Sequence, residues 1–191
     1  MRPAPVIVGL WLAWGISWLA ASGWSDATQK RAGSRAEIGY RAVLTLGWAA
    51  LLVPAHGYDG PLRLWHAGLG GAWICIVLIA VGFAFAWWGR IHLGRLWSGA
   101  ITKKAGHRVV DTGPYSFVRH PIYTGLLLSI LATAGAKGTV LGVVGALLMT
   151  IGLWMKARLE ERWLAAELDP DAYEAYRRRV PMLVPFGPKS R

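Results

Sequence analysis

Four long stretches of the chain are dominated by apolar residues, and their lengths predict helices that cross a membrane. They run from Val6 to Ala21, from Ala42 to about His56, from about Ala67 to Trp88, and from Ile122 to Trp154. A helix rises about 1.5 Å per residue and the hydrocarbon core is about 30 Å thick, so the last stretch is too long for one span. The glycine-containing segment Ala134-Gly-Ala-Lys-Gly138 divides it. This pattern predicts a tight hairpin of two helices there, and five spans in all.

The chain becomes charged after Met155 but keeps apolar residues at helical spacing, which predicts a half-buried helix. Asp169 and Pro170 suit the N-cap and first position of a further short helix that ends before Pro181. We therefore expect an all-α, polytopic integral membrane protein with amphipathic C-terminal helices. Residues 1–191 should form a single domain, with the N-terminal spans in 1–89 and the catalytic loop, the helical hairpin and the C-terminal helices in 90–191.

Two polar segments separate the first three spans. A loop is expected from Ser25 to Arg41, and a turn is expected at Gly57–Pro61 because glycine and proline cluster there. If the first loop is cytoplasmic, eighteen of the 21 Lys and Arg residues lie on that side, and Arg2, Arg63 and Lys137 lie outside. The positive-inside rule then places the N-terminus outside and the C-terminus inside. We expect a multi-pass protein of a bacterial inner membrane, with its active site facing the cytoplasm.

The composition supports a membrane protein over a nucleic-acid-binding one. Hydrophobic residues make up 54% of the chain and the formal net charge is +11. A basic soluble domain would not carry apolar runs of this length, so no nucleic acid is expected as a partner. Cys75 is the only cysteine, which excludes an intrachain disulfide, and the histidine spacing does not indicate a metal site.

Ionisable and turn-forming residues meet the start of an apolar run between Asp111 and Gly125. Pro121 restrains His120 to an extended conformation and suits the first position of a helix, whose free N–H groups attract anions. The alternative is interfacial anchoring, with Arg119 at lipid phosphates and the neighbouring aromatic residues in the interfacial belt.

An acidic pair, Glu160 and Glu161, interrupts the basic C-terminal segment. Lys156 lies one helical turn before Glu160, so one interpretation is a surface ion pair contributing only about 0.3 to 0.5 kcal/mol. The other is a site for a zwitterion, in which the carboxylate holds an ammonium group and the cation holds a carboxylate.

Several ordered motifs resemble the isoprenylcysteine carboxyl methyltransferase family, which is allied to the membrane phospholipid methyltransferases. They are Trp97-Ser-Gly-Ala-Ile-Thr, Gly106-His-Arg-Val-Val, Thr112 to Gly125, Glu160-Glu-Arg-Trp-Leu, and Tyr173 to Pro181. The resemblance covers roughly residues 97–185. It implies methyl transfer from S-adenosylmethionine to an amphipathic, lipophilic acceptor, with the cofactor in a cytoplasm-facing cavity.

Carried over by position, the resemblance implies cofactor contacts at His107, Arg108, Val109, Val110, Tyr115, His120, Pro121, Ile122, Tyr123 and Glu160. The family's substrate-contacting arginine falls on Lys156, which keeps the charge but loses the planar fork that grips a carboxylate. Arg158 is therefore a second candidate for binding the acceptor. A helix places these two residues about 200° apart, so both cannot point into one cavity.

The acceptor must present a lone pair to the methyl group. A carboxylate is already ionised at neutral pH, whereas an amine or thiol must first lose a proton. The absence of an obvious base favours O-methylation of a prenylcysteine-like or other lipophilic acid. The alternatives are N-methylation of a phospholipid amine, S-methylation of a hydrophobic thiol, a sterol-reductase-like activity, and a non-catalytic membrane scaffold.

Overall fold

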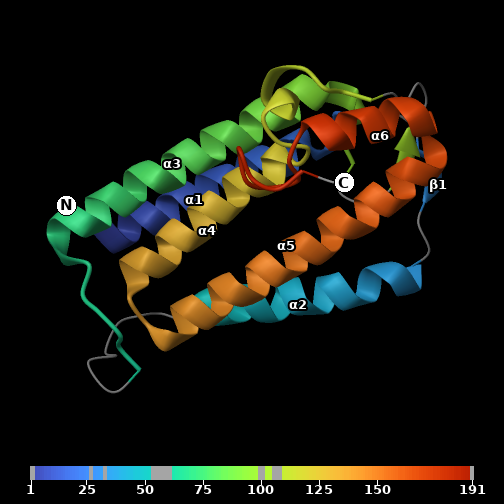
Figure 1. The fold of residues 1–191 in the computed structure, drawn as a ribbon. Coiled ribbons are helices and arrows are strands. Elements are labelled where there is room, and N and C mark those ends of the chain that lie inside the picture. Colours follow the sequence, from blue (N-terminus) through green and yellow to red (C-terminus); the bar gives the residue numbers. More distant parts are fainter. Residues whose placement is uncertain are drawn as a thin grey trace.

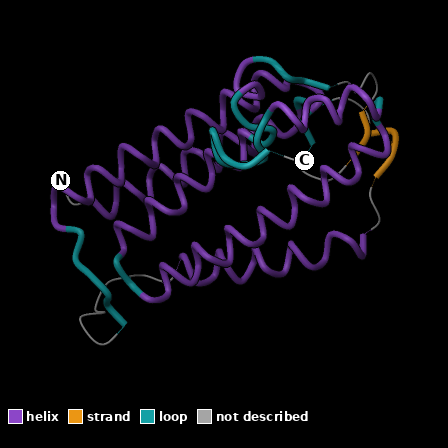
Figure 2. Tube along the Cα trace, viewed as in Figure 1, coloured by secondary structure: helices purple, strands orange, loops and turns teal. Residues whose placement is uncertain are grey.

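The computed structural model describes residues 3–25, 28–31, 34–52, 62–98, 102–104 and 109–189. Within these ranges the chain is mainly helical, as predicted (Figures 1 and 2). The longer helices are α1 (Pro3–Ala20), α2 (Ser34–Leu52), α3 (Gly68–Leu93), α4 (Pro121–Lys137) and α5 (Val140–Glu167), followed by the shorter α6 (Pro170–Arg179). Three short 3-10 helices accompany them: η1 (Ala21–Gly23), η2 (Gly94–Leu96) and η3 (Gly113–Ser116).

One small sheet was not predicted. Strand β1 (Thr28–Arg31) pairs antiparallel with β2 (Thr102–Lys104), with Arg31 opposite Thr102 and an irregularity near Thr28. This pairing joins the segment after the first predicted span to the segment after the third. The all-α class is confirmed, with this two-stranded addition.

Three helical segments are long and apolar enough to cross a membrane: Pro3–Gly23, Gly68–Leu96 and Val140–Glu167. The other two predicted spans correspond to α2, with 19 residues, and α4, with 17. The chain is thus an all-α integral membrane protein whose five long described helices follow the predicted order. That α2 and α4 also cross the membrane stays a prediction.

Two predicted helix boundaries were wrong. Helix α2 begins at Ser34, inside the expected loop, and Arg41 forms an ion pair with the buried Glu37 one turn earlier. This pairing lets a polar segment remain helical. Helix α3 continues to Leu93 because the side chain of Arg90 finds hydrogen-bond acceptors inside the bundle. The end of the second span and the turn at Gly57–Pro61 lie outside the described residues.

The predicted hairpin and C-terminal helix are confirmed. Helix α4 is followed by Gly138, which adopts the left-handed conformation at φ +59°, and Thr139 caps α5 by accepting a hydrogen bond from the backbone N–H of Gly142 at 3.1 Å. Asp169 caps α6, accepting from two backbone N–H groups at 3.0 Å each. Helix α5 runs without a break from the last predicted span to Glu167, so the predicted half-buried helix is its continuation.

The helices form two groups that meet at the α4–α5 hairpin and separate toward α6 (Figure 1). Helices α1, α3 and α4 form one group, and α2 packs along α5 to form the other. Gly82 and Gly125 permit the closest α3–α4 approach, since a Cβ on Gly125 would lie 2.3 Å from the carbonyl oxygen of Gly82. At the wider end, the segment before α4 lies against α3, and α6 follows the end of α5 (Figure 1).

Candidate functional site

A cavity of about 350 Å³ lies at the wider end of the helix bundle. Its volume falls within the range of about 300 to 1,000 Å³ that is usual for small-molecule sites. Its walls come from α1, α2, the end of α3, η3, α4, α5 and α6, and most of the lining surface is apolar. Distant parts of the chain therefore build this one cavity.

The cavity brings together most of the residues predicted to form the site. These are Val109, Val110, Tyr115, His120, Ile122, Tyr123, Lys156 and Glu160. Pro121 is fully buried at the first position of α4, beside the cavity. His107 and Arg108 lie outside the described residues. Lys156 lines this cavity, whereas Arg158 lines a separate hollow on α5.

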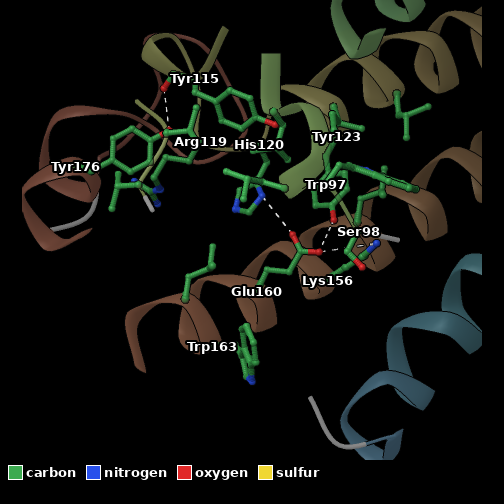
Figure 3. Close-up of a pocket in the computed structure, with 18 of the residues that line it drawn as sticks. Trp97, Ser98, Tyr115, Arg119, His120, Tyr123, Lys156, Glu160, Trp163 and Tyr176 are labelled. Carbon is green, nitrogen blue, oxygen red and sulfur yellow. Dashed lines mark hydrogen bonds and ion pairs between the residues drawn. The ribbon is translucent and has the colours of Figure 1, made fainter. Parts of the chain in front are cut away.

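Glu160 is the centre of the polar cluster in the cavity (Figure 3). The hydroxyl of Tyr123 donates a hydrogen bond to its Oε1 at 2.6 Å, and Nζ of Lys156 lies 3.8 Å from the same oxygen. Its Oε2 lies 3.6 Å from Nδ1 of His120. The side chain of Glu160 is 18% exposed, so this carboxylate faces the cavity with only partial hydration.

His120 lies between two carboxylates. Its ring stacks on that of Tyr123 with 5.3 Å between centroids, and its Nε2 lies 3.4 Å from Oε1 of Glu161. That nitrogen is buried and, among the described residues, has no hydrogen-bond partner. Because Nε2 faces Glu161, Nδ1 is the ring nitrogen that lies beside Glu160, the carboxylate that lines the cavity.

Arg119 is buried rather than interfacial, so the alternative that placed it at lipid phosphates was wrong. Its Nε donates to Oε1 of Glu161 at 2.6 Å, and the two side chains are 3% and 6% exposed. Its Nη1 also donates to the carbonyl oxygens of Arg177 at 2.9 Å and Val180. The two acidic residues thus have different roles. Glu160 faces the cavity, and Glu161 compensates the charge of the buried Arg119.

The segment after α6 fixes the start of α4. The backbone N–H of Arg119 donates to Pro181 at 2.9 Å, and that of His120 donates to Met182 at 3.1 Å. The hydroxyl of Thr124 donates to the carbonyl of Leu183 at 2.6 Å. The N–H of His120, expected to be free at this helix end, is therefore used within the protein. These bonds hold His120 against the cavity.

Aromatic residues that the sequence did not assign complete the walls. The hydroxyl of Tyr176 donates to the backbone carbonyl of Tyr115 at 2.8 Å, and both residues line the cavity (Figure 3). Burial raises the pKa of the Tyr115 hydroxyl, with a further contribution from Tyr176, so the group stays neutral. Trp14 and Trp18 of α1 also line the cavity. No local motif marks them, because only the packing of α1 on α3 brings them to the cavity.

Arg90 is a second buried guanidinium that the sequence did not single out. It donates hydrogen bonds to the carbonyls of Gly94 at 2.7 Å, Ala21 at 3.0 Å and Trp24 at 2.6 Å. Its guanidinium carbon lies 4.4 Å from the ring centre of Trp97, which lines the cavity. Arg90 therefore connects the ends of α1 and α3 and supports this wall.

The residues present suit a zwitterionic ligand with a flat apolar part. A carboxylate and a lysine provide opposite charges, the imidazole of His120 adds a polar group beside Glu160, and aromatic side chains provide surfaces for stacking. This charge pattern, enclosed by mostly apolar walls, fits S-adenosylmethionine, which carries an amino-acid group and an adenine. The fold and cavity define an all-α membrane protein with an amphipathic small-molecule site.

Comparison with known proteins supports the family resemblance. Residues 73–166 match the model of the isoprenylcysteine carboxyl methyltransferase (ICMT) family. The resemblance seen in the sequence is confirmed. The matched segment includes α4, most of α5 and the central residues of the cavity, His120, Tyr123, Lys156 and Glu160.

Three relatives illustrate the range of similar proteins. The cobalt-zinc-cadmium resistance protein CzcN of Cupriavidus metallidurans is 34% identical over 123 residues, which are 63% of this chain and 55% of that protein. A methanethiol S-methyltransferase of Crocosphaera subtropica is 44% identical over 77 residues, 40% of this chain and 29% of that protein. The protein-S-isoprenylcysteine O-methyltransferase of Schizosaccharomyces pombe is 32% identical over 104 residues, which are 51% of this chain and 42% of that protein. The chain spans less than two thirds of each.

Proposed function

We propose that this protein is an S-adenosylmethionine-dependent integral membrane methyltransferase that acts on a lipophilic acceptor. The observation that carries the proposal is the cluster of Glu160, His120, Tyr123 and Lys156 in one mostly apolar cavity. The family match over residues 73–166 and the names of two relatives support it. The concentration of basic residues in the segments joined at the cavity end supports a cytoplasmic site, in the inner membrane of a bacterium.

Most of the proposed cofactor contacts are residues that line the cavity. Glu160 is placed to hold an ammonium group, and His120, whose Nδ1 lies 3.6 Å from Glu160, lines the same part of the cavity. Val109, Val110, Tyr115, Ile122 and Tyr123 provide apolar and aromatic surface, Pro121 begins the supporting helix, and His107 and Arg108 are proposed to contribute from the preceding segment. When bound, S-adenosylmethionine supplies an electrophilic methyl group. The protein's own task is to orient the acceptor and exclude water.

Lys156 is the proposed acceptor contact. Its Nζ lies 5.3 Å from the ring centre of Tyr123 and 5.8 Å from that of Tyr40, so two aromatic rings and Glu160 hold the ammonium group near the cavity. An ammonium group there attracts the carboxylate of a lipophilic acid, the acceptor predicted from the sequence. Arg158 lies outside the cavity and is not proposed for this role.

A hydrophobic thiol is the second candidate acceptor, and the same lysine favours it. Lysine presents a compact point charge rather than a two-pronged fork, which matches a single sulfur anion as well as it matches one carboxylate oxygen. A thiol must lose its proton before or during transfer, and a positive charge beside it lowers the cost of forming the thiolate. The methanethiol S-methyltransferase among the relatives is consistent with this candidate.

Transfer of a tritiated methyl group tests the proposal. The purified protein in detergent is incubated with labelled S-adenosylmethionine and, in separate reactions, a prenylcysteine analogue, a long-chain alkanethiol and a phospholipid amine. Label in the first product supports the carboxylate, and label in the second supports the thiol. Absence of transfer to all three, with cofactor binding retained, would contradict the acceptor classes. Absence of both binding and transfer would contradict a methyltransferase.

A further inference from the structure

A second hollow, of about 560 Å³, lies on the other side of α5 from the cavity. It is lined by Tyr40 of α2, Arg177 of α6, and a run of α5 side chains: Trp154, Met155, Arg158, Leu159, Glu161, Arg162 and Ala165. The proposed methyl transfer does not use it. Its lining differs from that of the cavity, because three of the nine residues are arginines.

The hollow has an excess of positive charge. Arg158 and Arg162 lie one turn apart on α5, are exposed, and form no ion pair with an acidic side chain in the described part of the chain. Its only carboxylate belongs to Glu161, and that carboxylate is already compensated by the buried Arg119 at 2.6 Å. Arg177 is paired with Glu174 at 2.9 Å, so the guanidinium groups without a compensating carboxylate in the hollow are those of Arg158 and Arg162. Such groups bind phosphate oxygens with paired, charge-assisted hydrogen bonds.

An apolar track leads away from the two arginines along the same face of α5. Val144, Leu147, Ile151 and Trp154 are 39%, 57%, 48% and 46% exposed. Their spacing of three or four residues continues to Arg158 and Arg162, so all six side chains share one face. The track from Val144 to Arg158 is about 21 Å long at 1.5 Å per residue. Since Val140–Glu167 can span a membrane, this face suits an acyl chain.

Trp154 marks the boundary between the apolar track and the charged hollow. The guanidinium carbon of Arg158 lies 5.3 Å from the centre of its ring, and tryptophan is favoured where hydrocarbon meets the headgroup region. We propose that the hollow binds the headgroup phosphate of an anionic phospholipid, whose acyl chain lies along Val144, Leu147, Ile151 and Trp154. The lipid is a bound ligand and not the methyl acceptor.

Native mass spectrometry of the protein in detergent tests the site by titration with phosphatidylglycerol and, separately, phosphatidylcholine. The test variant is Arg158→Gln/Arg162→Gln. The matched control is Arg178→Gln/Lys189→Gln, which removes the same number of positive charges at exposed positions outside the hollow. One basic residue near an anionic lipid surface contributes about 1 kcal/mol to the binding free energy, which is about fivefold in affinity. We expect the test variant to lose about 25-fold in affinity for phosphatidylglycerol, and the control to lose less than twofold.

The remaining outcomes also decide the question. Equal losses in both variants would show that general surface charge attracts the lipid, and no loss in the test variant would show that the hollow does not bind it. Equal affinity of the wild-type protein for phosphatidylglycerol and phosphatidylcholine would show that the site does not recognise the net charge of the headgroup. Displacement of the lipid by inorganic phosphate alone would reveal a free-anion site instead. An unchanged melting temperature of the test variant excludes unfolding, and Trp154→Ala should weaken both lipids if the track is used.

Discussion

Removing one partner of the Arg119–Glu161 pair should destabilise the protein and loosen the candidate site. The pair joins the start of α4 to α5, and its side chains are 3% and 6% exposed with 2.6 Å between Nε and Oε1. Loss of one member of a buried ion pair typically costs about 3 to 5 kcal/mol, because the other charge remains buried. In Glu161→Ala, Arg119 would keep its bonds to two backbone carbonyls. We therefore expect Glu161→Ala to lower the free energy of unfolding by about 3 kcal/mol, the lower end of this range.

Thermal unfolding in detergent measures this effect. For a domain of this size about 1 kcal/mol corresponds to roughly 2 to 4 °C, so Glu161→Ala should lower the melting temperature by about 6 to 12 °C. The control is Glu174→Ala, which removes a carboxylate from a partly exposed pair with Arg177 and should change stability by at most about 1 kcal/mol. Similar melting temperatures for the two variants would refute the argument that the buried pair fixes α4 to α5.

The remaining predictions concern packing, the acceptor and topology. Gly125→Val should prevent normal folding, seen as loss of a monodisperse peak in size-exclusion chromatography, because any Cβ would lie 2.3 Å from a backbone oxygen of α3. Lys156→Met should lower kcat/KM for an anionic acceptor by about 10- to 150-fold, the equivalent of a charge-assisted hydrogen bond, whereas Arg158→Met should not; equal effects would contradict the assignment. In a Cys75→Ser background, a cysteine at position 189 should resist an impermeant thiol reagent in intact cells, and its modification would reverse the proposed orientation.

Much of the fold was predictable because membrane helices have long apolar sequences. The hairpin at Gly138 and the cap at Asp169 also depend on local residues, and both were predicted correctly. The start of α2 was missed because the ion pair between Glu37 and Arg41 keeps a polar segment helical. The β1–β2 pairing was missed because it joins segments about 70 residues apart, which a local pattern does not reveal.

The candidate site was predictable only in part. Glu160 stood out as an acid in a basic segment, and His120 stood out beside a proline at the start of an apolar run. The role of Arg119 was not predictable, since its charge suggested a surface position until the tail and Glu161 were seen to enclose it. The contribution of Trp14 depends on how α1 packs, and apolar membrane helices carry little sequence information about their neighbours.

Isothermal titration calorimetry with S-adenosylhomocysteine tests the central claim most directly. The account predicts that the wild-type protein in detergent binds this product, and that Glu160→Gln weakens binding by about tenfold or more, the loss expected for a charge-assisted hydrogen bond. The control Asp171→Asn, an exposed acid in the first turn of α6, should bind as the wild type does. No binding by the wild-type protein, or equal affinity of the wild type and Glu160→Gln, would contradict the proposal that this cavity holds the cofactor.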